Sequence, residues 1–438
     1  MESHPLIILE DNYYFAPILY NIATSIYESP FYWMLDDELY KEKSFENRGA
    51  TTVSIAHHLL AKIFGEKNVY SNVIVQKNKS TIETDIDILV LVNNKAIIVQ
   101  SKSKKFSALS RTGDTESVRK DFGKAVQEAF QQGIKCRNAL IQGNSVLIVN
   151  GKILKLETYI DEAYIICITT DHYPAITTQS RRYLQKLSND PYPLAMSIFD
   201  LDALAFYLTD PYDFLYYLRQ RIKTFEFCIA NSEIALLAYH LNQKLFLAPN
   251  FDGMSIEEDF AQLIDGDFPL IRGYQLKDTI DEKLQQPWKN KELAPLVLDI
   301  KQLKQVGFID ILYFIYDLSG KAASDLIDLI NQTKQKAIQA KQSQDFSMLF
   351  GVNGGISFLC LPPTYGNELS DRLMALAMAR KYKSKANIWL GLGAIATSSN
   401  LIDIFVFSQQ PWKEEPELEE LTKVALQKGK TLFTQTKK

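Results

Sequence analysis

The sequence has few cysteines, no long apolar run and no excess of positive charge. Its four cysteines, at 136, 167, 228 and 360, form no CxxC pair, which excludes a disulfide framework and a cysteine zinc site and favours reduced, buried thiols. No stretch approaches the roughly 18 apolar residues that a membrane-spanning helix needs. The N-terminus lacks a basic segment followed by an apolar one, so no signal peptide is predicted. We therefore expect a cytoplasmic protein without a membrane partner.

The charge balance limits which partners the whole chain attracts. Lysine and arginine number 48 against 52 aspartates and glutamates, which gives a net charge of −4. A nucleic-acid function must therefore depend on a local basic patch. With 438 residues, the chain is long enough for two or three folded domains. Its composition, 46% hydrophobic and 23% charged, argues against extended disorder.

Hydrophobic patterning predicts an α/β fold in three parts. Residues 1–45 are rich in aromatics and are expected to be a helical extension that turns at Ser29-Pro30 and packs on the next domain, because so short a segment cannot form its own core. Residues 46–224 form the main domain, and residues 225–438 an α+β domain of unknown role. The main domain is expected to contain helices at 50–64, 114–132, 198–207 and 211–222 and strands at 69–76, 145–149 and 163–170.

Between these strands lies the segment 83–104, ETDIDILVLVNNKAIIVQSKSK, which reads as a β-hairpin. Apolar residues alternate on both sides of Asn93-Asn94, and asparagine tolerates the positive φ of a two-residue turn. With this turn, Val92 pairs with Lys95, and every later pair along the hairpin is fixed.

That register brings four polar side chains together at the open end of the hairpin. Asp87 falls opposite Gln100, and Asp85 falls opposite Lys102. Directly opposed residues share a face, with Cβ atoms about 4.5–5.5 Å apart. Two carboxylates, an amide oxygen and an ammonium are therefore predicted to converge on one patch. A solvated strand end with a cross-strand salt bridge is the alternative reading.

This constellation resembles the catalytic core of a nuclease superfamily. Asp87 followed by Gln100-Ser101-Lys102 is similar to the D…(D/E)xK motif of PD-(D/E)XK, or restriction-endonuclease-like, nucleases, with glutamine in place of the acid as in Mrr-like members. The hairpin also resembles the EIDxLV…xxVxxVK signature of NERD-type domains. The segment GDTESVRKDFGKAVQEAFQQ resembles the helix beside their site. The resemblance covers roughly residues 46–175 and implies a mixed sheet flanked by helices.

The resemblance assigns roles to the hairpin residues. Asp87 and Gln100 would hold Mg²⁺ or Mn²⁺, and Lys102 would position the attacking water and stabilise charge on the phosphate. The Ser101 carbonyl is a further ligand, and Asp85 a possible additional acid of the site. Oxygen donors suit such hard cations, and a bound metal together with an ammonium offsets charge on phosphorus. Many members also carry a glutamate on the preceding helix, which the helix at 50–64 lacks.

The remaining polar residues leave alternatives open. Lys104 and Arg111 would contact phosphates, or belong to a solvated basic face. Asp121 and Gln132 would support the site from the next helix, or Asp121 would simply pair with a lysine. Of His57-His58, one is expected to pack and the other to be solvated. Asp171-His172 is expected to begin a turn, and the glycines at 391 and 393 are expected to lie in a strand rather than in a dinucleotide-binding loop.

Two functions follow from these features. The first is a metal-dependent nuclease that hydrolyses phosphodiester bonds in DNA rather than RNA and serves restriction of foreign DNA or repair. The second is an inactive nuclease-fold module that binds nucleic acid or protein. Because the chain is acidic overall, a homodimer would help nucleic-acid binding by doubling the basic patch.

Overall fold

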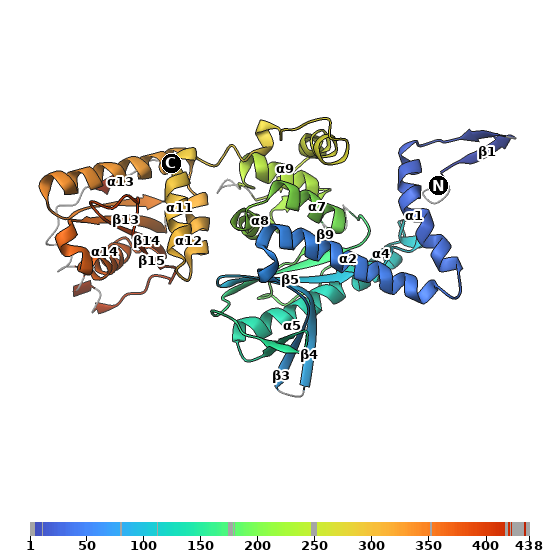
Figure 1. Cartoon of the computed structure of the whole chain (residues 1–438), viewed down its shortest axis with the longest axis horizontal. Helices are drawn as coiled ribbons and strands as arrows, with labels where there is room; N and C mark the ends of the chain where they lie inside the picture. Colours follow the sequence, from blue (N-terminus) through green and yellow to red (C-terminus); the bar gives the residue numbers. More distant parts are fainter. Residues whose placement is uncertain are drawn as a thin grey trace. The chain divides into compact units, whose positions relative to one another are not determined.

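The computed structural model describes residues 5–10, 12–78, 81–111, 113–173, 178, 180–246, 252–350, 353–416, 419–420, 422 and 433–434. The chain forms two compact units (Figure 1). Unit 1 comprises Met1–His240 and Leu245–Ile280, and unit 2 comprises Leu241–Lys244 and Asp281–Lys438. The domain boundary expected after residue 224 lies within unit 1.

Unit 1 is built on a seven-stranded mixed sheet, which agrees with the α/β prediction. Its strand order is β7-β6-β3-β4-β5-β8-β9. The central three strands form an antiparallel meander, and β8 and β9 extend the sheet in parallel to β5. The strands are β3 (Val69–Asn78), β4 (Thr81–Val92), β5 (Lys95–Lys102), β6 (Val146–Val149), β7 (Lys152–Leu154), β8 (Glu162–Thr169) and β9 (Leu194–Ser197).

Two long helices cover the central strands. Helix α2 (Lys41–Phe64) begins nine residues before the predicted start at residue 50 and ends, as predicted, before Gly65, whose φ of +83° suits glycine. The helix predicted at 114–132 consists of α4 (Thr115–Phe122), a π-helical turn and α5 (Glu128–Gln142). Helix α5 packs closely on β8, because a Cβ at Gly133 would lie 2.6 Å from Ile165 Cγ2.

The N-terminal segment packs on unit 1 through its helix. A hairpin of β1 (Ile7–Glu10) and β2 (Tyr13–Phe15) precedes α1 (Tyr20–Asp36). The turn expected at Ser29-Pro30 is wrong, because α1 continues through Pro30. Contacts on this helix, including the Glu28–Lys105 ion pair and the edge-to-face contact of Tyr27 with Phe199, outweigh the helix-breaking tendency of proline.

Further helices complete unit 1, and no helix in the described residues is long and apolar enough to cross a membrane. All four cysteines are buried, as predicted. The remaining elements are α3 (Ala108–Arg111), α7 (Ile198–Tyr207), α8 (Pro211–Thr224), β10 (Cys228–Ile229), α9 (Glu233–Gln243), β11 (Met254–Ser255) and α10 (Ala261–Asp265); the last residues of α9 belong to unit 2.

Unit 2 contains a second mixed sheet with helices. Gly391 and Gly393 lie in β14, as predicted, and their missing side chains let Leu373 of α14 approach the strand. The strand order is β15-β14-β13-β12, with the two-residue strand β16 (Phe433–Thr434) beside β12. The elements are α11 (Ala294–Leu303), α12 (Phe308–Tyr316), α13 (Gly320–Ala340), β12 (Gln344–Phe350), β13 (Gly354–Leu361), α14 (Leu369–Lys383), β14 (Ile388–Ile395) and β15 (Ile404–Ser408).

Candidate functional site

The hairpin of β4 and β5 has the predicted turn and register. Val92 pairs with Lys95, and the ladder continues without a shift to Ile88 and Val99. Asn93 adopts a φ of +54°, as expected for a residue in a tight two-residue turn. The sequence therefore predicted correctly which residues meet along the closed part of the hairpin.

Beyond Ile88 the regular strand geometry breaks at Asp87. Ile86 and Leu89 both contribute to the core beneath α5, although residues three apart on a regular strand face opposite sides. In the neighbouring strand β3 the alternation of side chains is interrupted at the same level, where Asn72 has a φ of +52°. Asp87 therefore faces the α2 side of the sheet, and its Oδ2 accepts a hydrogen bond from the backbone N–H of Ser101 at 2.7 Å.

A polar cavity of about 580 Å³ lies between α2 and the open end of the hairpin. Its floor includes the Asp87 carboxylate, and β5 contributes the residues that follow Gln100. The buried Ser101 Oγ has no hydrogen-bond partner among the residues that the structure describes. The lining residues are Gly49, Ala50, Val53, Ser54 and His57 of α2, Ser71 and Asn72 of β3, Asp87 of β4, and Ser101, Lys102 and Ser103.

The environment of Asp87 disfavours its charged form. Burial raises its pKa above the ordinary value, and the nearby Asp85 carboxylate raises it further. The Ser101 N–H and the Lys102 ammonium act in the opposite direction but do not outweigh burial. A cation beside this carboxylate would act against this shift, because it stabilises the charged form that burial disfavours.

Asp85 and Lys102 come together through a residue of α5. The Lys102 ammonium donates to Gln132 Oε1 at 3.1 Å, and Gln132 Nε2 donates to Asp85 Oδ1 at 2.6 Å. Gln132 thus contacts two of the residues that it was predicted to support, and its role at a site stays a prediction. This amide holds the lysine and the acid at one end of the sheet.

Gln100 does not face the cavity, contrary to the expectation that it shares a face with Asp87. It is fully buried, and its Nε2 donates to the backbone oxygen of Asp85 at 2.8 Å and lies 3.7 Å from Cys136 Sγ on α5. The physical reason is that the alternation of β4 residues between the α2 side and the α5 side of the sheet is interrupted at Asp87. The hairpin register alone does not reveal this interruption. Gln100 Oε1 is buried, and no described residue forms a hydrogen bond with it.

The donor atoms around Asp87 fit a hard divalent cation. The Asp87 carboxylate and the Ser101 Oγ, which has no hydrogen-bond partner among the described residues, are oxygen donors, which Mg²⁺ and Mn²⁺ prefer. The described residues contain no group of three or more histidine, cysteine, aspartate or glutamate side chains that could hold a metal. An ion bound here would therefore depend on Asp87, on the Ser101 Oγ and on oxygens of water or substrate.

The basic residues after the hairpin are partly neutralised. Lys104 forms an ion pair with the buried Asp121 at 3.2 Å, so the simpler prediction for Asp121 is confirmed. Burial acts to raise the pKa of Asp121, but hydrogen bonds from Ser110 and Ser107 outweigh it and lower this pKa to about 2. The side chain of Arg111 lies outside the described residues.

Two contacts at the site were not predicted from the sequence. His57 is half-buried and His58 exposed, as expected, but His57 also lines the same cavity as Asp87. The spacing of Gly49, Val53 and His57 at four-residue intervals was the available signal, since such residues share one helix face. The carboxylate of Asp171, expected only in a turn, forms a buried ion pair with the guanidinium of Arg48.

Comparison with known proteins identifies no relative. No family model matches the chain, and neither a curated protein nor a solved structure does.

Proposed function

We propose that this protein is a metal-dependent phosphodiesterase that cleaves nucleic acid, DNA rather than RNA, at the cavity beside Asp87. The observation that carries the proposal is the half-buried Asp87 carboxylate facing a polar cavity of about 580 Å³ that Lys102 also lines. A carboxylate of raised pKa in a polar cavity, with a lysine and a strand residue of positive φ among the same lining residues, is typical of a site for chemistry rather than for stability.

The fold supports the proposal only at the level of its architecture. The mixed sheet with helices on its faces is compatible with the restriction-endonuclease-like architecture that the sequence resemblance implies. In that reading α2 contributes His57 to the cavity, where many members of the superfamily have a glutamate on the corresponding helix.

Each residue would have a defined chemical task. Asp87 and Ser101 Oγ would hold Mg²⁺ or Mn²⁺ in the cavity. Gln100, the second ligand that the resemblance assigns, is buried on the α5 side and would not be part of this set. The bound ion would supply a metal-activated water and offset negative charge on phosphorus. Lys102, held by Gln132 at 3.1 Å, would place its ammonium against a phosphate oxygen and stabilise the charge that develops there.

The test is cleavage of plasmid, single-stranded DNA and RNA with Mg²⁺, Mn²⁺ or EDTA. We expect metal-dependent cleavage of DNA that falls about 100-fold or more in Asp87→Asn and in Lys102→Met. Asparagine retains an oxygen that can accept from Ser101, so the fold is kept. Lys124→Met removes an exposed lysine from the π-helical turn and serves as the matched control. Equal activity in all four proteins would refute the proposal.

A second candidate function is a binding module that has lost catalysis. Two observations favour it: Gln100 is buried on the α5 side, and Asp87 is the only carboxylate that lines the cavity among the described residues. This module would bind DNA without metal, with an affinity that falls with salt and is weaker in Lys102→Met. Fluorescence anisotropy in EDTA, combined with absence of cleavage, would identify it.

The biological setting belongs to the same proposal. Restriction of foreign DNA or repair would both use such an activity, and a homodimer would double the number of lysines presented to the duplex. Sedimentation of the protein with and without a short duplex measures whether two copies bind together.

A further inference from the structure

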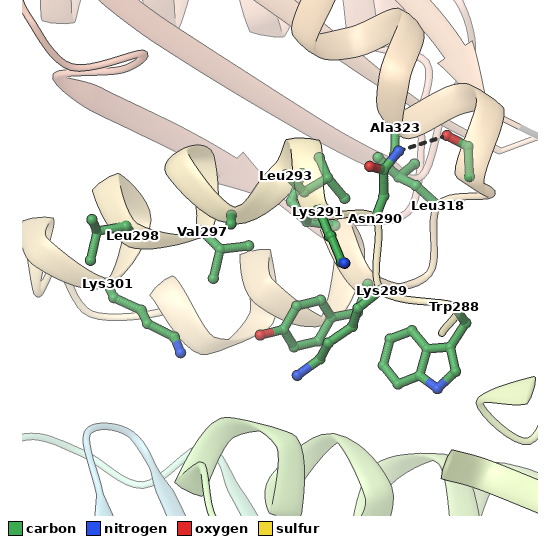
Figure 2. Close-up of a pocket in the computed structure, with 14 residues that line it drawn as sticks. Trp288, Lys289, Asn290, Lys291, Leu293, Val297, Leu298, Lys301, Leu318 and Ala323 are labelled. Carbon is green, nitrogen blue, oxygen red and sulfur yellow. Dashed lines mark hydrogen bonds between the residues drawn. The ribbon is translucent and has the colours of Figure 1, made fainter. Parts of the chain in front are cut away.

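Unit 2 contains a pocket of about 370 Å³ that is separate from the cavity at Asp87 (Figure 2). One wall is a single face of α11, where Ala294, Val297, Leu298 and Lys301 recur at the spacing of an amphipathic helix. Three apolar positions followed by a cation give this wall an apolar stretch that ends in a positive charge. The volume falls within the range of roughly 300–1,000 Å³ for small-molecule sites.

The opposite side of the pocket is aromatic and fixed in place. The Trp288 and Tyr316 rings meet edge to face, with centroids 6.1 Å apart. The Lys289 ammonium lies 5.3 Å from the Tyr316 ring and 5.8 Å from the Trp288 ring. Asn290 donates to the backbone oxygen of Gly320 at 3.1 Å, which ties the loop bearing Trp288 to the start of α13. A wall held in this way loses little conformational freedom on binding.

The charges of the lining residues have one sign. Three lysines, at 289, 291 and 301, line the pocket, and no aspartate or glutamate is among its described lining residues. In Figure 2 the side chains of Lys289 and Lys301 come from opposite ends of the view and end on the same side of α11. Such a pocket favours an anion, and its apolar walls reward a ligand with an apolar body.

We propose that this pocket binds a small organic anion with an apolar body, of the kind represented by a medium-chain carboxylate. The chain of the ligand would lie along Val297 and Leu298, and its anionic group would lie among the lysines. A neutral apolar molecule would gain no attraction from the positive charge of the lining residues, and a cation would be repelled. The proposal does not depend on the nuclease function, because every residue involved belongs to unit 2.

The experiment follows the indole signals of the full-length protein by ¹H–¹⁵N NMR. The chain has four tryptophans, and Trp288→Phe assigns the signal of Trp288. Decanoate should shift that signal in a saturable way and leave the other three in place. Decanol and decyltrimethylammonium have the same chain length without the negative charge, so they should shift it at least tenfold more weakly.

Two variants with matched controls test the two halves of the pocket. Ala294→Phe fills the apolar wall and should abolish the shift, whereas Ala340→Phe places the same ring at an exposed site of α13 and should not. Lys301→Glu should weaken decanoate binding about tenfold or more, whereas the exposed Lys336→Glu should leave it unchanged. Absence of a decanoate shift, equal response to decyltrimethylammonium, or a shift by adenosine monophosphate alone would overturn the proposal.

Discussion

The ion pair between Arg221 of α8 and Glu233 of α9 gives a sharp test of what stabilises unit 1. Two hydrogen bonds of 2.9 Å join the guanidinium to the two carboxylate oxygens. The side chains are 3% and 0% exposed, and the Tyr217 hydroxyl also donates to Glu233. Glu233→Gln keeps the shape of the side chain but removes the negative charge and replaces one acceptor oxygen by an amide NH₂ that cannot accept a hydrogen bond.

The expected loss of unfolding free energy follows from the burial of both side chains. Glu233 is the strongest charge favouring the protonated form of Arg221, since it opposes the desolvation that would lower the pKa of this guanidinium. Without it, a buried cation lacks its counter-charge, which typically costs about 3–5 kcal/mol. Replacing both partners, as in Arg221→Met with Glu233→Leu, removes the charge as well as the pairing, and we expect it to cost less than the single substitution.

Urea-dependent amide exchange measured by mass spectrometry resolves this effect by unit. Peptides from α8 and β8 should lose about 3–5 kcal/mol of protection in Glu233→Gln, whereas a peptide from β13 of unit 2 should not change. Glu116→Gln, at an exposed position of α4, controls for loss of one negative charge and should stay within about 0.5 kcal/mol. A loss below about 1 kcal/mol in Glu233→Gln, or a double variant less stable than the single one, would refute the reasoning.

Three further predictions concern Asp87, Asp121 and Gly133 of unit 1. Because burial raises the pKa of Asp87, its ionisation destabilises the folded state as pH rises. Asp87→Asn should therefore have a higher melting temperature than the wild type at pH 7, and this difference should shrink on acidification. Mg²⁺ should raise the melting temperature of the wild type only. Asp121 has a lowered pKa, so Asp121→Asn should be less stable at neutral pH, and the deficit should disappear as pH falls from 3.8 to about 2 in melts followed by circular dichroism. Gly133→Ala should cost about 1–3 kcal/mol in urea unfolding, since its Cβ would press against Ile165; an unchanged midpoint would show that α5 can move away.

Sequence reasoning succeeded where short-range rules act. The pairing of Val92 with Lys95 follows from the local turn at Asn93-Asn94, and one pair then fixes the others. The strand assignment of Gly391 is correct for the same kind of reason, because the segment after it reads as another strand and not as a helix.

It failed where distant segments decide the conformation. Pro30 lies within α1 because residues around it are held by groups far along the chain, such as Lys105. Likewise, the register places Asp87 opposite Gln100, but the change of side at Asp87 accompanies a residue of positive φ in β3, Asn72. Neither effect can be read from the residues that are close to Pro30 or Asp87 along the chain.

The sequence by itself determined the hairpin, its register and the choice of Asp87, Gln100 and Lys102 as candidates, because these depend on contacts within some twenty residues. The tertiary structure alone decided that Asp87 faces a cavity under α2, that His57 shares this cavity, and that Gln100 is buried against α5. Which side of a strand a residue faces near an irregularity is set by the elements packed on both sides of the sheet. That packing is a property of the whole fold and not of any local pattern.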